Sequence, residues 1–359
     1  MAFSSFSKRE WWVFILFVIV LIVSTLGILQ VINQSFMVSV PTHGGSIQEG
    51  IIGTPRFVNP ILANSSADQD MVALVYSGLM RKNSDGTLSP DLAASYEASE
   101  DGLTYIFKLK DNLYFHDDTP LTVDDIIFTI EQARDPVLKS SQKLNWDRVG
   151  TEKIDEKTIK FSLKQPYASF LENITLGILP MHIWGDSAIE LHEANTNPIG
   201  SGPYKIKNFN KQSSGTVDSF ELTSFKKFAL GEPYIRNITI RFYQNEEALT
   251  EALTNGEISQ ISSITPENAK NLEEKGYKVE STVLPRVFGL FFNQNQNQLF
   301  INKTVVNAID QAIDKERIIR EVLSGYGTLI DDPITLNLVE YHSLSSKNTT
   351  PRADSLKKV

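Results

Sequence analysis

The stretch Asp-Gly-Leu-Thr-Tyr-Ile-Phe-Lys-Leu at residues 101–109 decides how the rest of the chain is interpreted. Within it, apolar and polar side chains alternate, which is typical of a strand with one buried face. The segment at 158–163 repeats the same alternation. We therefore expect the two segments to be neighbouring strands of one sheet, and the expected core partners are Tyr105, Phe107, Ile159 and Phe161.

Helix signals surround these strands. Thr122 is followed by Asp125 at the spacing of a capping box, and apolar residues then recur at helical spacing until Pro136. Strands and helices in mixed order favour α/β or α+β lobes over a sandwich or a helical bundle. The other expected strands are 204–209, 238–243 and 287–293, and the other expected helices are 245–255, 265–276 and 304–324, the last interrupted near Asp314.

An uncharged apolar run from Trp11 to Ile32 precedes all of these elements. As a helix it would reach about 33 Å, enough for a hydrocarbon core of about 30 Å. Lys8 and Arg9 stand before it, and the positive-inside rule places them in the cytoplasm. The run predicts a single-pass anchor in the cytoplasmic membrane with the bulk of the chain outside. A cleaved signal peptide and a buried core helix are the alternatives.

The composition excludes several classes of function. A net charge of -9 with a pI near 5.2 offers no basic surface for nucleic acid. The chain has no cysteine, which excludes disulfides, thiolate catalysis, cysteine-based metal centres and a lipid anchor on an N-terminal cysteine.

The search for reactive groups predicts no catalytic site, no metal site and no cofactor. Phosphate-binding, dinucleotide-binding and nucleophile-elbow motifs are missing from the sequence, and its five histidines form no zinc-binding motif. Adjacent carboxylates such as Asp124 and Asp125 begin the helix after Thr122, where the helix dipole favours negative charge. We therefore expect a protein that is not an enzyme.

Five collinear stretches carry a resemblance to a known family. They are Asn59-Pro60 with 75–79, 88–96, 101–109 continued by 115–117 and 120–125, Asn197 to Tyr204, and 291–293 continued by 308–314. In this order and spacing, across about residues 45–330, the chain resembles the family 5 solute-binding proteins, the oligopeptide- and dipeptide-binding proteins of ABC importers. The match at 101–125 is the most specific of the five.

The resemblance implies an α/β fold of the type II periplasmic binding proteins (cluster C), with two lobes behind one transmembrane helix. The implied boundaries are 1–34 for the cytoplasmic tip and anchor, 35–45 for a linker, 46–284 for the first lobe with an inserted subdomain at about 85–195, and 285–359 for the start of a second lobe. We expect this second lobe to be incomplete, with a polar tail from residue 345 onward.

The implied function is a receptor that captures oligopeptides or dipeptides outside the membrane and delivers them to an ABC permease and its ATPase. We expect a monomer attached to the membrane through Trp11–Ile32. The alternatives are a receptor of the same class for a metal chelate or an oligosaccharide, and a membrane-anchored sensor or hydrolase ectodomain. A peptide receptor needs a cleft of backbone donors and acceptors between two lobes rather than reactive side chains.

Several residues are candidates for this cleft and its hinge. The expected ligand-binding residues are Tyr76, Ser77, Gly78, Trp184, Arg286, Phe288 and Asn293, and the expected hinge or turn residues are Gly200, Gly202 and Pro203. For Tyr76 to Gly78 the alternative is the end of a core helix, for Trp184 a packing role, and for Asn293 a cap.

The sequence also departs from the family pattern. Asp118 occupies a position where the family usually has glycine, so we expect the turn at 116–119 to differ. Val306 stands where many members carry arginine. The acidic residue with which members commonly hold the peptide's amino terminus has no counterpart here, and we assign none.

Overall fold

The computed structural model describes residues 7–36, 40–167, 169–185, 188–213, 215–281 and 287–330. It divides the chain into two units, residues 1–43 and 44–359, which are described separately. Several expected features lie outside the described residues: linker residues 37–39, residues 282–286 at the expected start of the second lobe, and the polar tail from residue 345 onward.

The first unit is one long helix, α1 (Lys8–Phe36). Its stretch Arg9–Ile32 has a mean hydropathy of 2.9 over 24 residues, and none of it is buried. Length and composition suit a membrane span, and they suit a signal sequence equally well.

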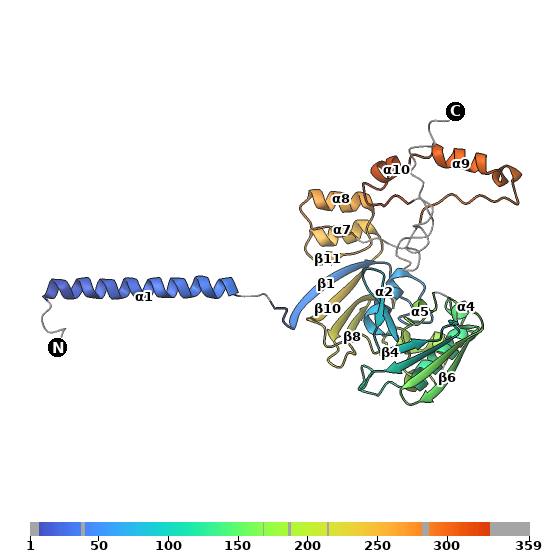
Figure 1. Cartoon of the computed structure of the whole chain (residues 1–359), viewed down its shortest axis with the longest axis horizontal. Helices are drawn as coiled ribbons and strands as arrows, with labels where there is room; N and C mark the ends of the chain where they lie inside the picture. The colour runs from blue at the N-terminus through green and yellow to red at the C-terminus, as the bar shows by residue number, and fades with distance from the viewer. Residues whose placement is uncertain are drawn as a thin grey trace. The chain divides into compact units, whose positions relative to one another are not determined.

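The second unit contains a five-stranded mixed sheet in the order β11-β1-β10-β9-β8. β1 pairs in parallel with β10 and with β11, whereas β10, β9 and β8 pair antiparallel. In Figure 1 the helices α7 and α8 lie beside the β11 end of this sheet. The strands are β1 (Gly44–Ile52), β8 (Tyr204–Lys211), β9 (Val217–Ser224), β10 (Ile235–Tyr243) and β11 (Gln260–Ile261).

A second sheet is antiparallel and has the order β4-β5-β7-β6. Its strands are β4 (Ala93–Ala98), β5 (Thr104–Leu109), β6 (Val149–Asp155) and β7 (Thr158–Leu163). Figure 1 shows it as a group apart from the five-stranded sheet. A short hairpin, β2 (Met80–Lys82) with β3 (Leu88–Pro90), precedes it.

The central strands of this second sheet confirm the expected core. Tyr105 lies opposite Phe161 and Phe107 opposite Ile159, and all four side chains are buried. The rings of Phe107 and Phe161 meet edge-on with centroids 5.7 Å apart. Alternation along β5 and β7 therefore predicts the buried face correctly.

The helices begin where the sequence provides caps. In α3 (Val123–Arg134) the Asp125 carboxylate accepts hydrogen bonds from the Thr122 amide at 2.8 Å and from its hydroxyl at 3.0 Å. Asn245 caps α7 (Glu246–Thr254) and Thr265 caps α8 (Pro266–Glu274). The remaining helices are α2 (Ser66–Val75), α4 (Lys143–Trp146), α5 (Phe170–Asn173), α6 (Met181–Trp184), α9 (Lys303–Ala312) and α10 (Lys315–Glu321), with short 3-10 turns η1 (Ile189–Leu191), η2 (Glu193–Asn195) and η3 (Gln298–Ile301).

One expected strand does not form. Residues 287–293 have no regular secondary structure, and Phe288 and Phe291 are 86% and 91% exposed. A strand is stabilised by pairing with a neighbour, and no strand pairing includes this segment within the described residues. The prediction of a strand at 287–293 is therefore wrong.

Candidate ligand-binding site

The carboxyl ends of the parallel strands form one edge of the five-stranded sheet. β1, β10 and β11 run in the same direction, so the loops that follow them leave the sheet at the same edge. In open α/β sheets, ligands bind outside the carboxyl ends of the strands. We therefore consider the loops after β1, β10 and β11 as the primary candidate site.

Hydrogen bonds hold this edge in shape. The Gly53 amide donates to the Tyr243 carbonyl at 2.8 Å, which joins the ends of β1 and β10. The Glu246 carboxylate accepts from the Thr265 amide at 2.6 Å and from its hydroxyl at 3.0 Å, which ties the start of α7 to the start of α8. Ser263, in the loop after β11, has a φ of 59°. Such left-handed non-glycine residues are strained and occur frequently at functional sites.

A buried junction of glycine-containing segments lies elsewhere in the same unit. The Gly202 amide donates to the Val75 carbonyl at 2.8 Å, and the Ile178 amide donates to the Ser77 carbonyl at 2.9 Å. A β-carbon on Gly202 would lie 2.6 Å from the Val75 carbonyl carbon, and one on Gly78 would lie 2.6 Å from the Thr175 carbonyl. Only glycine allows backbones to approach this closely.

Polar groups are buried within this junction. Tyr76 is 4% exposed, and burial raises the pKa of its hydroxyl. Within the described part of the chain the Tyr76 hydroxyl and the Ser201 hydroxyl find no hydrogen-bond partner. Burial also raises the pKa of Asp91, although the Ser77 hydroxyl and the charge of Lys110 act in the opposite direction. Buried polar groups in native structures are nearly always hydrogen-bonded to protein or to internal water.

His116 connects the junction to the turn that follows Phe115. Its Nδ1 faces the Gly200 amide at 3.3 Å and its Nε2 faces the Gly202 carbonyl at 3.1 Å. Nδ1 must then accept and Nε2 donate, which is possible only for the neutral ring. Burial, opposed by the contact with the Gly202 carbonyl, lowers the pKa of His116 to about 4.

The structure brings some expected site residues together and separates others. Tyr76, Ser77, Gly78, Gly200 and Gly202 meet in the junction, and Pro203 continues from it. Trp184 is buried in α6 and packs on the ring of His192, with centroids 4.9 Å apart. Arg286 lies outside the described residues.

The expected residues of segment 287–293 are exposed. The Phe288 side chain contacts solvent. The Asn293 side-chain oxygen accepts from the amides of Asn295 and Gln296 at 3.1 and 3.2 Å, so Asn293 caps a turn.

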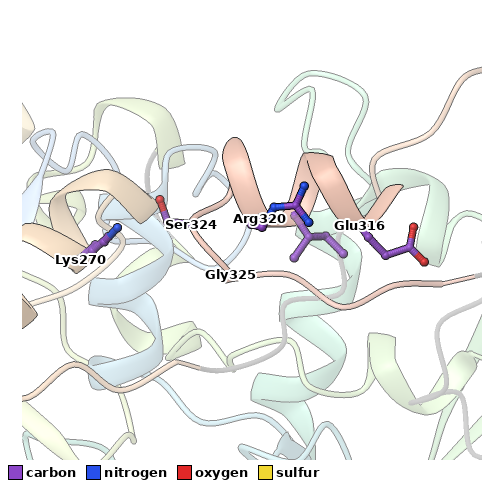
Figure 2. Close-up of a pocket in the computed structure, with 6 residues that line it drawn as sticks. Lys270, Glu316, Arg320, Ser324 and Gly325 are labelled. Carbon is purple, nitrogen blue, oxygen red and sulfur yellow. The ribbon is translucent and has the colours of Figure 1, made fainter. Parts of the chain in front are cut away.

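Sequence reasoning missed a cavity that lies between α8 and α10 (Figure 2). It measures about 440 Å³ and is lined by Lys270, Glu316, Ile319, Arg320, Ser324 and Gly325. Its charged residues come from two helices that are more than 40 residues apart in sequence, so no local motif joins them. The i, i+4 spacing of Glu316 and Arg320 was the only signal in the sequence.

No metal centre emerges from these side chains. Within the described residues, no group of three or more His, Asp or Glu side chains is placed to hold a metal ion.

Comparison with known proteins decides the family. Residues 87–358 match the family model described as bacterial extracellular solute-binding proteins, family 5 Middle. The chain belongs to this family. Its fold is that of the type II periplasmic binding proteins, and members of the family are solute receptors of ABC importers rather than enzymes.

Three relatives illustrate the range of similarity. The oligopeptide-binding protein AppA of Bacillus subtilis is 28% identical over 308 residues, which are 83% of this chain and 55% of AppA. Its structure in complex with a nonapeptide matches with a TM-score of 0.63 over 83% of this chain and 59% of AppA, at 26% identity.

The ABC transporter substrate-binding protein CtaP of Listeria monocytogenes is 36% identical, with a TM-score of 0.57 over 65% of this chain and 47% of CtaP. The glutathione-binding protein GsiB of Pectobacterium atrosepticum is 28% identical over 79% of this chain and 55% of its own length. The chain thus spans about half the length of the relatives that it matches.

Proposed function

We propose that this chain is a peptide receptor that captures oligopeptides or dipeptides outside the cytoplasmic membrane and delivers them to an ABC permease and ATPase. One observation carries the proposal. AppA, an oligopeptide-binding protein, matches 83% of this chain both by sequence and by structure. The same proposal includes a membrane anchor at Trp11–Ile32, which keeps the rest of the chain outside the cytoplasm, and a role without catalysis.

The structure supports recognition of a peptide backbone. The loops after β1, β10 and β11 leave the sheet at the same edge, where their backbone amides and carbonyls are the contacts that this proposal gives to a peptide. Every peptide presents the same backbone, so such a surface suits ligands of varied sequence. In this proposal residues 46–284 form the first lobe, with the inserted subdomain at about 85–195, and the second lobe begins near residue 285.

The expected site residues have different roles in this proposal. Tyr76 to Gly78 and Gly200 to Pro203 are largely buried, and in this proposal they support the first lobe from within the junction. Phe288 and Asn293 are exposed and available to a ligand. Trp184 supports the inserted subdomain from its core.

A second ligand is favoured by a specific observation. GsiB, a glutathione-binding protein, matches nearly as much of this chain as AppA does. Glutathione is a tripeptide whose first linkage runs through a side chain, so its backbone register differs from that of an ordinary peptide.

Calorimetric titration of the 359-residue chain in detergent micelles tests the proposal. The probes are a nonapeptide of mixed composition, the same nonapeptide with alternate amides N-methylated, and glutathione. We expect the nonapeptide to bind at least tenfold more tightly than the methylated form, because methylation removes backbone donors. Binding of glutathione alone, or equal binding of both nonapeptides, would overturn the proposal.

A further inference from the structure

Residues 115–119 form a turn between β5 and α3 that contacts three other segments of the chain. Three consecutive side chains make these contacts. His116 contacts the segment 200–202 that precedes β8, Asp117 contacts α6, and Asp118 contacts the loop between β9 and β10. The turn therefore joins segments that lie far apart in sequence, and two of its three contacts involve titratable histidines.

The contact with the segment 200–202 depends on the charge of the His116 ring. Its Nδ1 accepts from the Gly200 amide at 3.3 Å and its Nε2 donates to the Gly202 carbonyl at 3.1 Å. The His116 amide also donates to the Gly200 carbonyl at 2.8 Å. A protonated ring carries a hydrogen on both nitrogens, so it cannot accept from the Gly200 amide. Protonation therefore favours a state in which the segment 200–202 has separated from the turn.

The charges that face His116 come from the turn itself and from β8. Asp117 favours protonation of the ring, whereas Lys205 of β8 opposes it. The ring of Phe225 packs edge-on against His116, with centroids 4.9 Å apart. Burial has the largest effect, and it lowers the pKa of His116 from 6.5 to about 4. The closed turn thus keeps the ring neutral at pH values where a solvated histidine is protonated.

The contact on the other side of the turn responds to acid in the opposite direction. The His182 Nε2 lies 2.7 Å from the Asp117 carboxylate, and both side chains are partly exposed. Protonation of His182 turns this contact into an ion pair, which strengthens it. Burial acts to raise the pKa of Asp117, but hydrogen bonds from His182 and Thr119 outweigh it and lower that pKa. The carboxylate therefore remains available to His182 in mild acid.

We propose that the turn 115–119 is an acid-sensitive latch, which holds the segment 200–202 while His116 is neutral and releases it when His116 takes up a proton. The turn then stays attached to α6 through Asp117. Because the Gly202 amide donates to the Val75 carbonyl at 2.8 Å, release of this segment also loosens its contact with the end of α2. The latch works in the same way whichever solute the chain binds.

The pH dependence of opening follows from the proton that the open state takes up. The open ring binds a proton near pH 6.5, and the closed ring binds one only near pH 4. Above pH 6.5 both states are neutral, and opening does not depend on pH. Between pH 6.5 and pH 4 the open state gains roughly tenfold for each unit by which the pH falls, which is roughly 100-fold in all from pH 7 to pH 4.

Hydrogen–deuterium exchange of the 359-residue chain in detergent micelles, read by mass spectrometry between pH 7 and pH 4, tests the latch. Protection factors remove the pH dependence of the exchange chemistry itself. We expect the protection of peptides that contain His116 and 200–202 to fall roughly 100-fold over this range. It should also stay below that of β5 and β7 at every pH, because a local opening needs less free energy than global unfolding. In His116→Gln the fall should be lost, since the amide side chain accepts and donates without titrating.

The matched control is His182→Gln, which keeps a donor for Asp117 and should retain the fall in protection at 200–202. Far-UV circular dichroism at each pH checks that every variant is folded. Protection that does not change with pH in the wild type, or that falls equally in His116→Gln, would overturn the proposal. Equal protection of the turn and of β5 at every pH would also overturn it, because the turn would then open only when the whole chain unfolds.

Discussion

His116 is held neutral by its surroundings, and this makes the stability of the fold depend on pH. Burial lowers its pKa from 6.5 to about 4, and the Gly200 amide occupies the nitrogen that protonation would need. In the unfolded chain His116 is protonated below about pH 6.5, whereas in the folded chain the ring stays neutral down to about pH 4. The contribution of the neutral ring to the free energy of unfolding is therefore complete above pH 6.5 and is lost as the pH falls through 4.

Between pH 7 and pH 4 we expect the free energy of unfolding of the wild type to fall by about 3 kcal/mol more than that of His116→Gln. Denaturant unfolding at several pH values measures this difference, and the comparison cancels the titration of the carboxylates that both proteins share. A difference that stays constant across this range would show that the ring is not held in its neutral form.

Asp118 adopts the conformation that glycine favours. Its φ is 69°, and its amide donates to the Phe115 carbonyl at 3.0 Å within the turn. The turn at 116–119 thus has a backbone that suits the glycine usual in the family as well as this aspartate. We expect Asp118→Ala to lower the free energy of unfolding by about 1 kcal/mol relative to Asp118→Gly.

The comparison is well matched, because both variants lose the exposed ion pair with Lys227. Urea unfolding of the two proteins measures the difference. Equal stability of the alanine and glycine variants would mean that the left-handed conformation costs nothing here.

At the level of single elements, the sequence predicted secondary structure best for segments that bury one face. The alternation in β5 and β7 and the cap before α3 depend on neighbours in sequence, and the structure confirms all three. The segment 287–293 shows the limit of this reasoning. An apolar pattern indicates only that a segment can be buried, whereas a strand also requires a hydrogen-bonding partner elsewhere in the chain.

The candidate site was harder to predict for the same reason. The sequence pointed to Tyr76, Gly200 and Gly202 separately, but their contact depends on how segments more than 100 residues apart cross. The cavity at Lys270 and Glu316 has no local signal beyond the i, i+4 spacing of Glu316 and Arg320. Sites of this kind depend on which elements pack together, and the periodicity of the sequence does not reveal this.

The crossing of these segments gives a prediction of its own. A β-carbon on Gly202 would lie 2.6 Å from the Val75 carbonyl carbon and 2.7 Å from the Tyr76 nitrogen, both of them backbone atoms. We expect Gly202→Ala to lower the free energy of unfolding by about 2–3 kcal/mol, because one of the two segments must move.

The matched control is Gly289→Ala. The nearest atom to its new β-carbon is in the Phe291 ring at 3.8 Å, and we expect a change within about 0.5 kcal/mol. Urea unfolding of both variants measures the contrast. A Gly202→Ala protein as stable as the control would show that the junction can relax without cost.

At the scale of the whole molecule, the order of five separated stretches was more informative than any element. It indicated the family before any tertiary contact was known, and the family model then matched residues 87–358. The family is one of solute receptors, and the helix at Arg9–Ile32 has the length and composition of a membrane span or of a signal sequence.

We expect this helix to remain as an anchor, with Lys8 and Arg9 in the cytoplasm and the chain from Pro41 onward outside. As a helix, the uncharged run from Trp11 to Ile32 reaches about 33 Å and spans a core of about 30 Å. The chain should then stay with membranes after alkaline carbonate extraction, keep its original N-terminus on sequencing, and be digested from Pro41 onward by protease added to intact cells.

Val20→Arg places a charge at the centre of the span at a cost of about 2.5–3.5 kcal/mol, and should weaken membrane retention, whereas Val40→Arg should not. Release of a soluble protein whose first residue lies beyond Ile32 would identify the helix as a cleaved signal peptide, and protection of the region after Pro41 would reverse the orientation.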